Sequence, residues 1–373
     1  MNHREENNAK HAAFDLYGHE NAEQMFLGAY NSDRLHHAWL ITGPRGIGKA
    51  TLAQKIARFL LNNPPDDRAV PSLFGDSSEK IPPSILATDE LSAVNKRISS
   101  GGHGGLIVIE RQPNEKTGKM KAEIVVDDVR KLQKFFTKTA TEGGWRIAII
   151  DSADEMNRNA ANAVLKLLEE PPRNALLILL AHAPGKLLPT ITSRCRQLRL
   201  NPLSLEAVCE ILALHYPEIG QDEIAGYAVL SDGSPGYAIN LVENQGLELY
   251  IQLLEILASL PHLDVPISHK LADSLSLKAA AAKYILFGEL LTVFINRMIR
   301  HVAAIENDEI SPVKAVLTGE LDLMMQLGQR IPLDHWAELW EKVTFKMAEI
   351  NLDRKQVILN VLTMLNQKLN HKI

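Results

Sequence analysis

The sequence predicts an α/β protein, in which a mostly parallel sheet covered by helices is followed by an all-helical C-terminal part. Strand and helix patterns alternate from about residue 38 to residue 200, as in repeated strand-helix-strand units. The strand patterns are unbroken apolar runs, which are typical of parallel strands buried on both faces. Beyond that region the strand signals stop and helical periodicity takes over. With 373 residues, we therefore expect two or three domains, with a change of pattern near residue 200.

Composition and charge describe an ordinary globular protein. The chain has 373 residues, of which 46% are hydrophobic and 23% charged, and its formal net charge is −5. This balance excludes a uniformly basic surface, so contact with nucleic acid has to come from a local patch. Two cysteines, Cys195 and Cys209, exclude a disulfide framework and a four-cysteine zinc site and fit a reducing cytosol. The N-terminus is polar and no apolar run reaches about 18 residues, so we expect a cytoplasmic protein outside the membrane.

A glycine-rich stretch after the first strand is the first candidate site. A helix is expected at 21–31, a strand at 38–41, and a further helix after the glycines. Gly43, Gly48 and Lys49 match the phosphate-binding loop pattern G-x-x-x-x-G-K-[ST]. Glycines let successive N–H groups point at a phosphate, the following helix offers its positive N-terminus, and the lysine reaches the outer phosphates.

The last position of that pattern is Ala50, which lacks the expected hydroxyl. A Ser or Thr there would hold Mg²⁺, and Thr51 cannot replace it because a helix turns its side chain about 100° away. The order of strand, glycine loop and helix favours a phosphate site. A simple glycine turn at the start of a helix, found in many α/β proteins, is the alternative.

The next region, 62–105, is rich in Pro, Ser and Gly and reads as a loop-rich insertion with one helix near 90–99. A buried strand is expected at 106–109 and a short strand at 122–126. The helix after them should begin near Asp127 or Asp128, which suit an N-terminal cap. It carries basic residues that are either a solvated face or a contact for nucleic acid or phosphate, namely Arg130, Lys131, Lys134 and Lys138.

A second informative stretch is the apolar run 147–150, which ends in Asp151. This pattern describes a central parallel strand with a carboxylate at its C-terminal end, where α/β sheets hold their ligands. In a phosphate-loop ATPase this acid holds Mg²⁺, and the following residue is commonly a glutamate that polarises the attacking water. Here the following residue is Ser152. Asp154 and Glu155 are interpreted as caps of the next helix.

The remaining elements follow from periodicity. We expect a helix at 159–170 stopped by two prolines, a buried strand at 175–181 and a closing strand at 198–200. Small helices follow over 203–243. An apolar stripe that includes Trp336 and Trp340 favours helix-bundle packing, with a surface for a partner subunit as the alternative.

These features together resemble the clamp-loader branch of the AAA+ ATPases. The resemblance rests on 37–49, 126–130, the A-N-A-x-L-K-x-L-E-E-P-P run at 161–172, and the segment 187–195 that ends in Ser193-Arg194-Cys195. It covers roughly 14–240 and implies three domains: an AAA+ domain at 1–200, a small helical lid at 201–245 and, at 246–373, a helical collar that joins other subunits. It also implies a site for ATP or ADP, whose cofactor-binding residues would be Gly43, Arg45, Gly46, Gly48, Lys49, Ala50, Thr51 and Asp151.

Several departures from the family separate its members. Hydrolysing relatives have Ser or Thr where Ala50 stands and Glu where Ser152 stands, and they usually present a threonine where Ala181 and His182 stand. The arginine expected after Gly233-Ser234 is missing, and so is the cysteine zinc module expected within 62–105. The resemblance therefore implies weak or absent hydrolysis, no zinc and no other metal site.

The implied function is structural and regulatory. Arg194 would be an arginine finger in trans, reaching the γ-phosphate of ATP on a neighbouring motor subunit, with pairing to a local carboxylate as the alternative. The implied partners are motor subunits and a clamp-opening subunit in a heteropentamer, and through the complex the sliding clamp and primed DNA. An ATP-hydrolysing motor subunit that uses Asp154 or Glu155, and a free-standing AAA+ DNA remodeller, are the alternatives. Nucleotide occupancy, stoichiometry, DNA contacts and the role of 62–105 stay open.

Overall fold

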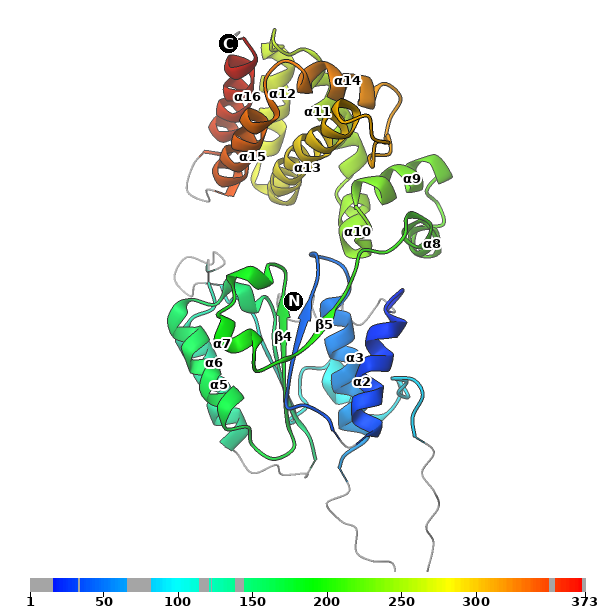
Figure 1. Ribbon diagram of the computed structural model, residues 1–373, viewed down its shortest axis with the longest axis vertical. Helices are drawn as coiled ribbons and strands as arrows, with labels where there is room; N and C mark the ends of the chain where they lie inside the picture. Colours follow the sequence, from blue (N-terminus) through cyan, green and yellow to red (C-terminus); the bar gives the residue numbers. More distant parts are fainter. Residues whose placement is uncertain are drawn as a thin grey trace, which may run out of the picture. The chain divides into compact units, whose positions relative to one another are not determined.

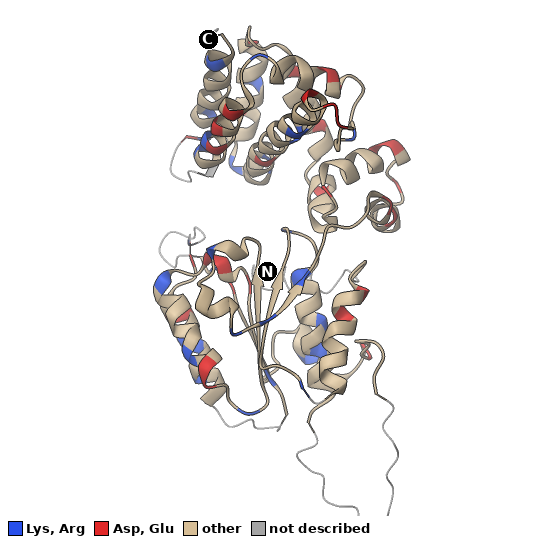
Figure 2. Cartoon of the chain, in the orientation of Figure 1, with Lys and Arg blue, Asp and Glu red and all other residues tan. Residues whose placement is uncertain are grey.

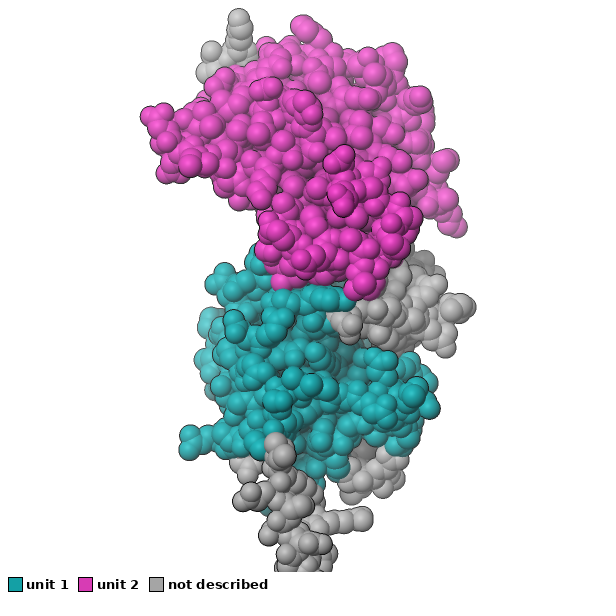
Figure 3. Space-filling model, turned by 90° about the vertical axis from the view of Figure 1, so that its right-hand side faces the viewer, with its two compact units in different colours: residues 1–202 teal, residues 203–373 magenta. Residues whose placement is uncertain are grey.

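The computed structural model describes residues 16–32, 34–65, 82–113, 121, 123–137, 144–348 and 353–370. Two compact units divide the chain, residues 1–202 and residues 203–373, coloured separately in Figure 3. The first unit is the α/β part and the second is all helical. The expected domain 1–200 stays a prediction. The further division into a lid at 201–245 and a collar at 246–373 stays a prediction.

One five-stranded sheet organises the first unit. Its strands lie in the order β2-β3-β4-β1-β5, and every neighbouring pair is parallel. The central strands β1 and β4 are buried at every position, as expected for parallel strands covered on both faces. The strand bounds are β1 Ala38–Thr42, β2 Leu106–Ile109, β3 Arg146–Ile150, β4 Ala175–Ala181 and β5 Arg196–Arg199. The predicted fold class of this part is confirmed.

Helices cover both faces of the sheet (Figure 1). Trp39 and Ile41 of β1 pack with α2, α3 and α4, whereas Ala38 and Leu40 pack with α5, α6 and α7. This alternation follows from the two-residue period of a strand. The helix bounds are α2 Glu20–Asn31, α3 Lys49–Asn62, α4 Ala93–Ser99, α5 Val126–Thr137, α6 Arg158–Glu169 and α7 Pro189–Thr192. Short 3₁₀ turns lie at η1 Ala153–Glu155 and η2 Pro184–Lys186.

The predicted short strand at 122–126 is wrong for its described residues. Only Ile124 forms a bridge, to Met156, and helix α5 already begins at Val126. Asp127 and Asp128 lie in the first turn of α5, where acidic side chains favour the positive end of a helix. The two hydrogen bonds that Ile124 makes, to the backbone of Glu155 and Asn157, nevertheless anchor this segment beside the turn after β3.

The second unit is a helical bundle with one continuous apolar core. Its helices are α8 Leu205–His215, α9 Gln221–Leu230, α10 Pro235–Glu243, α11 Gly246–Ala258, α12 Val265–Ser276, α13 Ala281–Glu306, α14 Glu320–Gly328, α15 Leu333–Ala348 and α16 Arg354–Asn370, with the turn η3 Lys278–Ala280. Trp336 and Leu339 of the predicted apolar stripe are buried, while Trp340 is 37% exposed. Bundle packing is thus confirmed for most of the described stripe.

Helix α13 runs through the core of this unit. With the preceding turn η3 it is long and apolar enough to cross a membrane by length and composition alone. Phe287, Leu290, Leu291 and Phe294 are, however, at most 1% exposed and pack against neighbouring helices. Such burial is the property of a core helix in a bundle.

Candidate functional site

The candidate site lies at the carboxyl ends of β1, β3 and β4. Because neighbouring parallel strands end at the same edge of the sheet, the loop after β1 lies beside the turns after β3 and β4. The glycine loop Gly43–Gly48 leads from β1 into α3. The structure therefore brings the predicted loop and Asp151 to one edge, as expected from the sequence.

Two of the loop glycines are required by geometry. A Cβ atom on Gly43 would lie 2.6 Å from the carbonyl oxygen of Leu200, in the chain that leaves β5. Gly48, the residue before helix α3, has φ +107°, a conformation that side-chain-bearing residues rarely adopt. The loop backbone can take this path because these positions are glycine.

Lys49 is buried and lies over the loop. Lys49 as a whole is 4% exposed. Its Nζ donates hydrogen bonds to the carbonyl oxygens of Gly43 (2.7 Å) and Pro44 (2.6 Å). Burial lowers the pKa of Lys49 to about 8, against the opposing effect of the Asp151 and Asp154 carboxylates. The lysine thus carries most of its charge at neutral pH, within the loop that would receive a phosphate.

His19 also holds the loop, and sequence reasoning missed it. It precedes α2, is 5% exposed, and its Nε2 lies 2.7 Å from the carbonyl oxygen of Ile47. With the proton on Nε2, the ring donates to that oxygen and fixes the loop just before Gly48. A lone histidine before a helix gives no sequence signal for this contact.

The prediction that Asp154 and Glu155 cap the next helix is wrong. Asn157 is the N-cap of α6 and accepts a hydrogen bond from the Ala160 N–H. Asp154 instead accepts hydrogen bonds from the N–H groups of His182 (3.1 Å) and Ala183 (2.9 Å), at the end of β4. Burial alone raises the pKa of Asp154, but these N–H groups outweigh it and hold the pKa below its usual value. Asp154 therefore ties the turn after β3 to the end of β4.

His182 stands next to this turn. Its Nε2 lies 3.1 Å from the hydroxyl of Ser152, a residue with the left-handed φ of +61°. Burial, with the nearby charges of Lys49 and Arg45, lowers the pKa of His182 to about 4. The imidazole is therefore neutral at physiological pH. Its place at the end of β4 is the signal that could have assigned it to the site.

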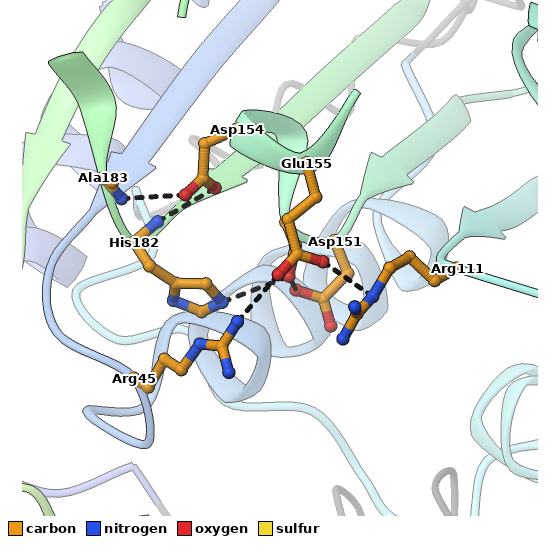
Figure 4. A network of polar contacts seen from close by, with 8 residues as sticks. Arg45, Arg111, Asp151, Asp154, Glu155, His182 and Ala183 are labelled. Atoms are coloured by element: carbon orange, nitrogen blue, oxygen red, sulfur yellow. Dashed lines mark hydrogen bonds and ion pairs between the residues drawn. The ribbon is translucent and has the colours of Figure 1, made fainter. Parts of the chain in front are cut away.

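Glu155 links the glycine loop to the end of β2 (Figure 4). Its Oε1 lies 2.7 Å from Nη2 of Arg45, and its Oε2 lies 2.7 Å from Nε of Arg111. The Glu155 side chain is 17% exposed, whereas that of Arg45 is 65% exposed. Arg111 was not predicted as a site residue, since nothing in its local sequence distinguishes it from a solvated arginine.

The remaining predicted loop residues lie where the sequence placed them. Ala50 and Thr51 are in the first turn of α3, and both are partly buried. Gly46 is exposed in the loop with φ +72°. Among the residues that the structure describes, no three His, Cys, Asp or Glu side chains gather as metal ligands. The predicted absence of zinc stays a prediction, since 66–81 of the insertion lie outside the described residues.

Arg194 lies after α7 and forms local contacts. Its Nη1 donates to the carbonyl oxygen of Thr190 (3.1 Å), and its Nη2 lies 3.2 Å from Oε1 of Glu169. The two side chains of this ion pair are 39% and 53% exposed, and exposed pairs contribute about 0–1 kcal/mol. A pair this weak leaves the guanidinium able to change partner.

The basic residues of α5 are largely balanced within the helix. Arg130 pairs with Asp127 (2.7 Å) and Lys131 with Asp128 (2.8 Å). Figure 2 accordingly shows both signs of charge along this helix. These pairs favour the interpretation of a solvated face, while Lys138 lies outside the described residues.

The chain is similar to subunits of DNA polymerase III. The family model described as "DNA polymerase III, delta subunit" matches residues 18–204, half of the chain. DNA polymerase III subunit delta' of Pseudomonas aeruginosa is 37% identical over 199 residues, which cover 53% of this chain and 53% of that protein. The Bacillus subtilis subunit delta' is 36% identical over 50% of this chain and 48% of its own length. This chain thus spans about half the length of these curated relatives.

More distant similarities extend to another subunit of the same polymerase. DNA polymerase III subunit tau of Escherichia coli is 29% identical over 52% of this chain and 26% of its own length. Among solved structures, a DNA polymerase III gamma subunit-related protein of Thermotoga maritima covers 93% of this chain and all of its own, with a TM-score of 0.40 and 17% identity.

Proposed function

The chain belongs to the DNA polymerase III delta subunit family, and from this premise we propose that it is a non-hydrolysing, delta-prime-type subunit of the clamp loader. In this role it helps to load the sliding clamp onto primed DNA during replication, in the cytoplasm. Its partners are the motor subunits and the clamp-opening subunit of a heteropentamer. Contacts with clamp and DNA are made through the complex.

The observation that carries this proposal is that both carboxylates in the turn after β3 are already engaged in contacts within the protein. Asp154 accepts two backbone N–H groups and Glu155 contacts two arginines. Hydrolysing relatives have a water-polarising glutamate at the position of Ser152. Because Asp154 and Glu155 are both engaged in these contacts, neither is free to take over that role. Together with Ala50, which offers no hydroxyl to a metal ion, this supports slow or absent hydrolysis.

The loop nevertheless fits phosphate binding. The glycine backbone of 43–48, the N-terminus of α3, and Lys49 supply the positive groups that hold phosphates. Arg45 and Asp151 lie at the same edge. A bound ATP or ADP would act as a structural ligand that stabilises the loop, with no metal-assisted step assigned to Ala50 or Thr51.

Arg194 is the residue that we assign to catalysis, in trans. Its pair with Glu169 is weak and half-exposed, so a γ-phosphate on a neighbouring subunit competes readily for the guanidinium. An arginine finger contributes about 10³ to 10⁵ to turnover at its site. Removing Arg194 should therefore silence the one neighbouring site that it serves.

The test is ATP hydrolysis by the purified chain, alone and mixed with motor subunits, clamp-opening subunit, clamp and primed DNA. We expect no turnover alone, DNA-stimulated turnover in the mixture, and loss of one site's share of it with Arg194→Ala. Arg199→Ala, at an exposed arginine of β5, is the matched control and should leave turnover unchanged. Sustained turnover by the isolated chain would instead identify a motor subunit, and self-assembly into rings would identify a free-standing remodeller.

A further inference from the structure

The carboxylate Glu155 lies beside the glycine loop and Lys49, groups that are suited to binding anions such as phosphate. Its two oxygens contact guanidinium groups from separate segments, Arg45 in the glycine loop and Arg111 after β2, each at 2.7 Å. The carboxylate is largely buried at 17% exposure, so these contacts are screened by water less than a surface pair. The Arg45 contact is a charge-assisted hydrogen bond, one of the stronger polar interactions in proteins, whereas the Arg111 contact is an ion pair without hydrogen-bond geometry.

The contact restrains the loop that would receive a phosphate. Arg45 lies between Gly43 and Gly48, and it is close enough to Lys49 to lower the pKa of the amine. While Arg45 is held by Glu155, its charge is neutralised by a carboxylate of the protein. An incoming phosphate therefore competes with Glu155 for the same cation.

Nearby contacts keep Glu155 in this position. Its backbone carbonyl accepts a hydrogen bond from the Ile124 N–H (2.9 Å), and its N–H donates to the Ser152 carbonyl (2.8 Å). The adjacent Asp154 is fixed to the end of β4 by two N–H groups. The carboxylate is thus held on a rigid turn, while the exposed side chain of Arg45 is the partner that can move.

We propose that Glu155 is an internal competitor of phosphate, which holds Arg45 and Arg111 and so weakens nucleotide binding at the glycine loop. The inference rests on the proposed function, because it assumes a site that binds nucleotide without hydrolysing it. When nucleotide binds, Arg45 leaves Glu155 and contacts the phosphates, while Arg111 keeps the carboxylate paired. Glu155 and Arg45 are affinity-determining residues in this proposal, and neither takes part in a chemical step.

The alternative is that the ion pairs only fasten the loop to the turn after β3. The two interpretations predict opposite effects of Glu155→Gln on ATP affinity. If Glu155 competes with phosphate, Glu155→Gln releases Arg45 for the phosphates of ATP. ATP affinity then rises by about tenfold, as expected for one additional charge-assisted contact. If the ion pairs only hold the loop in place, their loss makes the loop more mobile, so ATP affinity stays the same or falls.

The experiment measures binding of ATP to the full chain by titration calorimetry at low salt. We expect Glu155→Gln to bind ATP about tenfold more tightly than the unmodified chain, and Glu155→Gln combined with Arg45→Gln to lose this gain. Glu170→Gln, at an exposed glutamate at the end of α6, removes the same charge elsewhere and should not change affinity. Thermal unfolding of each variant verifies that the first unit remains folded.

The outcomes separate this inference from the proposed function. Unchanged or weaker ATP binding by Glu155→Gln, or a gain that persists without Arg45, would overturn the role of Glu155 as competitor. The absence of ATP binding by every folded variant would overturn it as well. Hydrolysis assayed on the same samples tests the proposed function independently, since turnover by the unmodified chain contradicts that function whatever the affinities are.

Discussion

Replacement of Gly43 by alanine tests how tightly the glycine loop is built into the sheet. The residue follows β1 between two neighbours: its N–H donates to the Ala181 carbonyl of β4, and the preceding Thr42 carbonyl accepts from the Leu200 N–H. The new Cβ would lie 2.6 Å from the Leu200 carbonyl oxygen and 3.3 Å from a methyl group of Ile47. A methyl group can give way, but the Leu200 backbone is tied to β1 through its N–H and moves less readily.

The cost has two parts. Overpacking against a backbone atom costs about 1–3 kcal/mol, because either the loop or the end of β5 must shift. The φ of +151° adds about 1–3 kcal/mol for a residue that carries a Cβ. We therefore expect Gly43→Ala to lower the free energy of unfolding by about 2–6 kcal/mol.

Urea denaturation followed by circular dichroism measures this change, with Gly28→Ala as the control. Gly28 lies inside α2, and a Cβ there would meet nothing within 4 Å. Alanine is the better helix former, so this variant should gain about 0.5–1 kcal/mol. A Gly43→Ala protein as stable as the unmodified chain would refute the argument that the loop path requires glycine.

Three further predictions concern titration and buried charge. Because the pKa of Lys49 is about 8 and a bound phosphate favours the charged amine, ATP affinity should fall about fivefold from pH 8 to pH 9. Lys49→Arg keeps its charge and should show no such fall by calorimetry. The pKa of His182 is lowered from 6.5 to about 4, so the unfolded chain takes up a proton in this window that the folded chain does not. Stability should thus fall by about 1–2 kcal/mol from pH 6.5 to pH 4, allowing for the partial exposure of the ring, and urea denaturation of His182→Asn should show a smaller fall. Glu320→Gln leaves the buried Arg297 guanidinium, 3.0 Å away, without its counter-charge and should cost about 3–5 kcal/mol in the same assay. Asp232→Asn, at an exposed pair with 3.9 Å separation, should cost at most about 1 kcal/mol, and equal costs for the two variants would contradict the role of burial.

Much of the fold could be predicted because its signals are local. The apolar runs at 38–41, 147–150 and 175–181 are strands, since a parallel strand covered on both faces is apolar at every position. The short segment 122–126, with apolar residues at 124–126, was wrongly predicted as a strand. Its length suits a strand or the start of a helix equally, and the acidic residues that follow it favour the helix.

The candidate site was predicted in part. Gly43, Gly48 and Lys49 could be assigned because a fixed spacing along the chain determines the loop, and Asp151 because it ends a strand. The assignment of Asp154 and Glu155 as caps failed because proximity to a helix in sequence does not reveal a nearer partner in space.

The sequence by itself determined the order of the strands along the chain, the glycine loop and the absence of the hydroxyl at Ala50, since each is a property of consecutive residues. The tertiary structure alone decided that His19, Arg111 and Glu155 surround that loop. These residues come from segments far apart in sequence. They meet because parallel strands direct their carboxyl ends, and the turns that follow them, to one edge of the sheet.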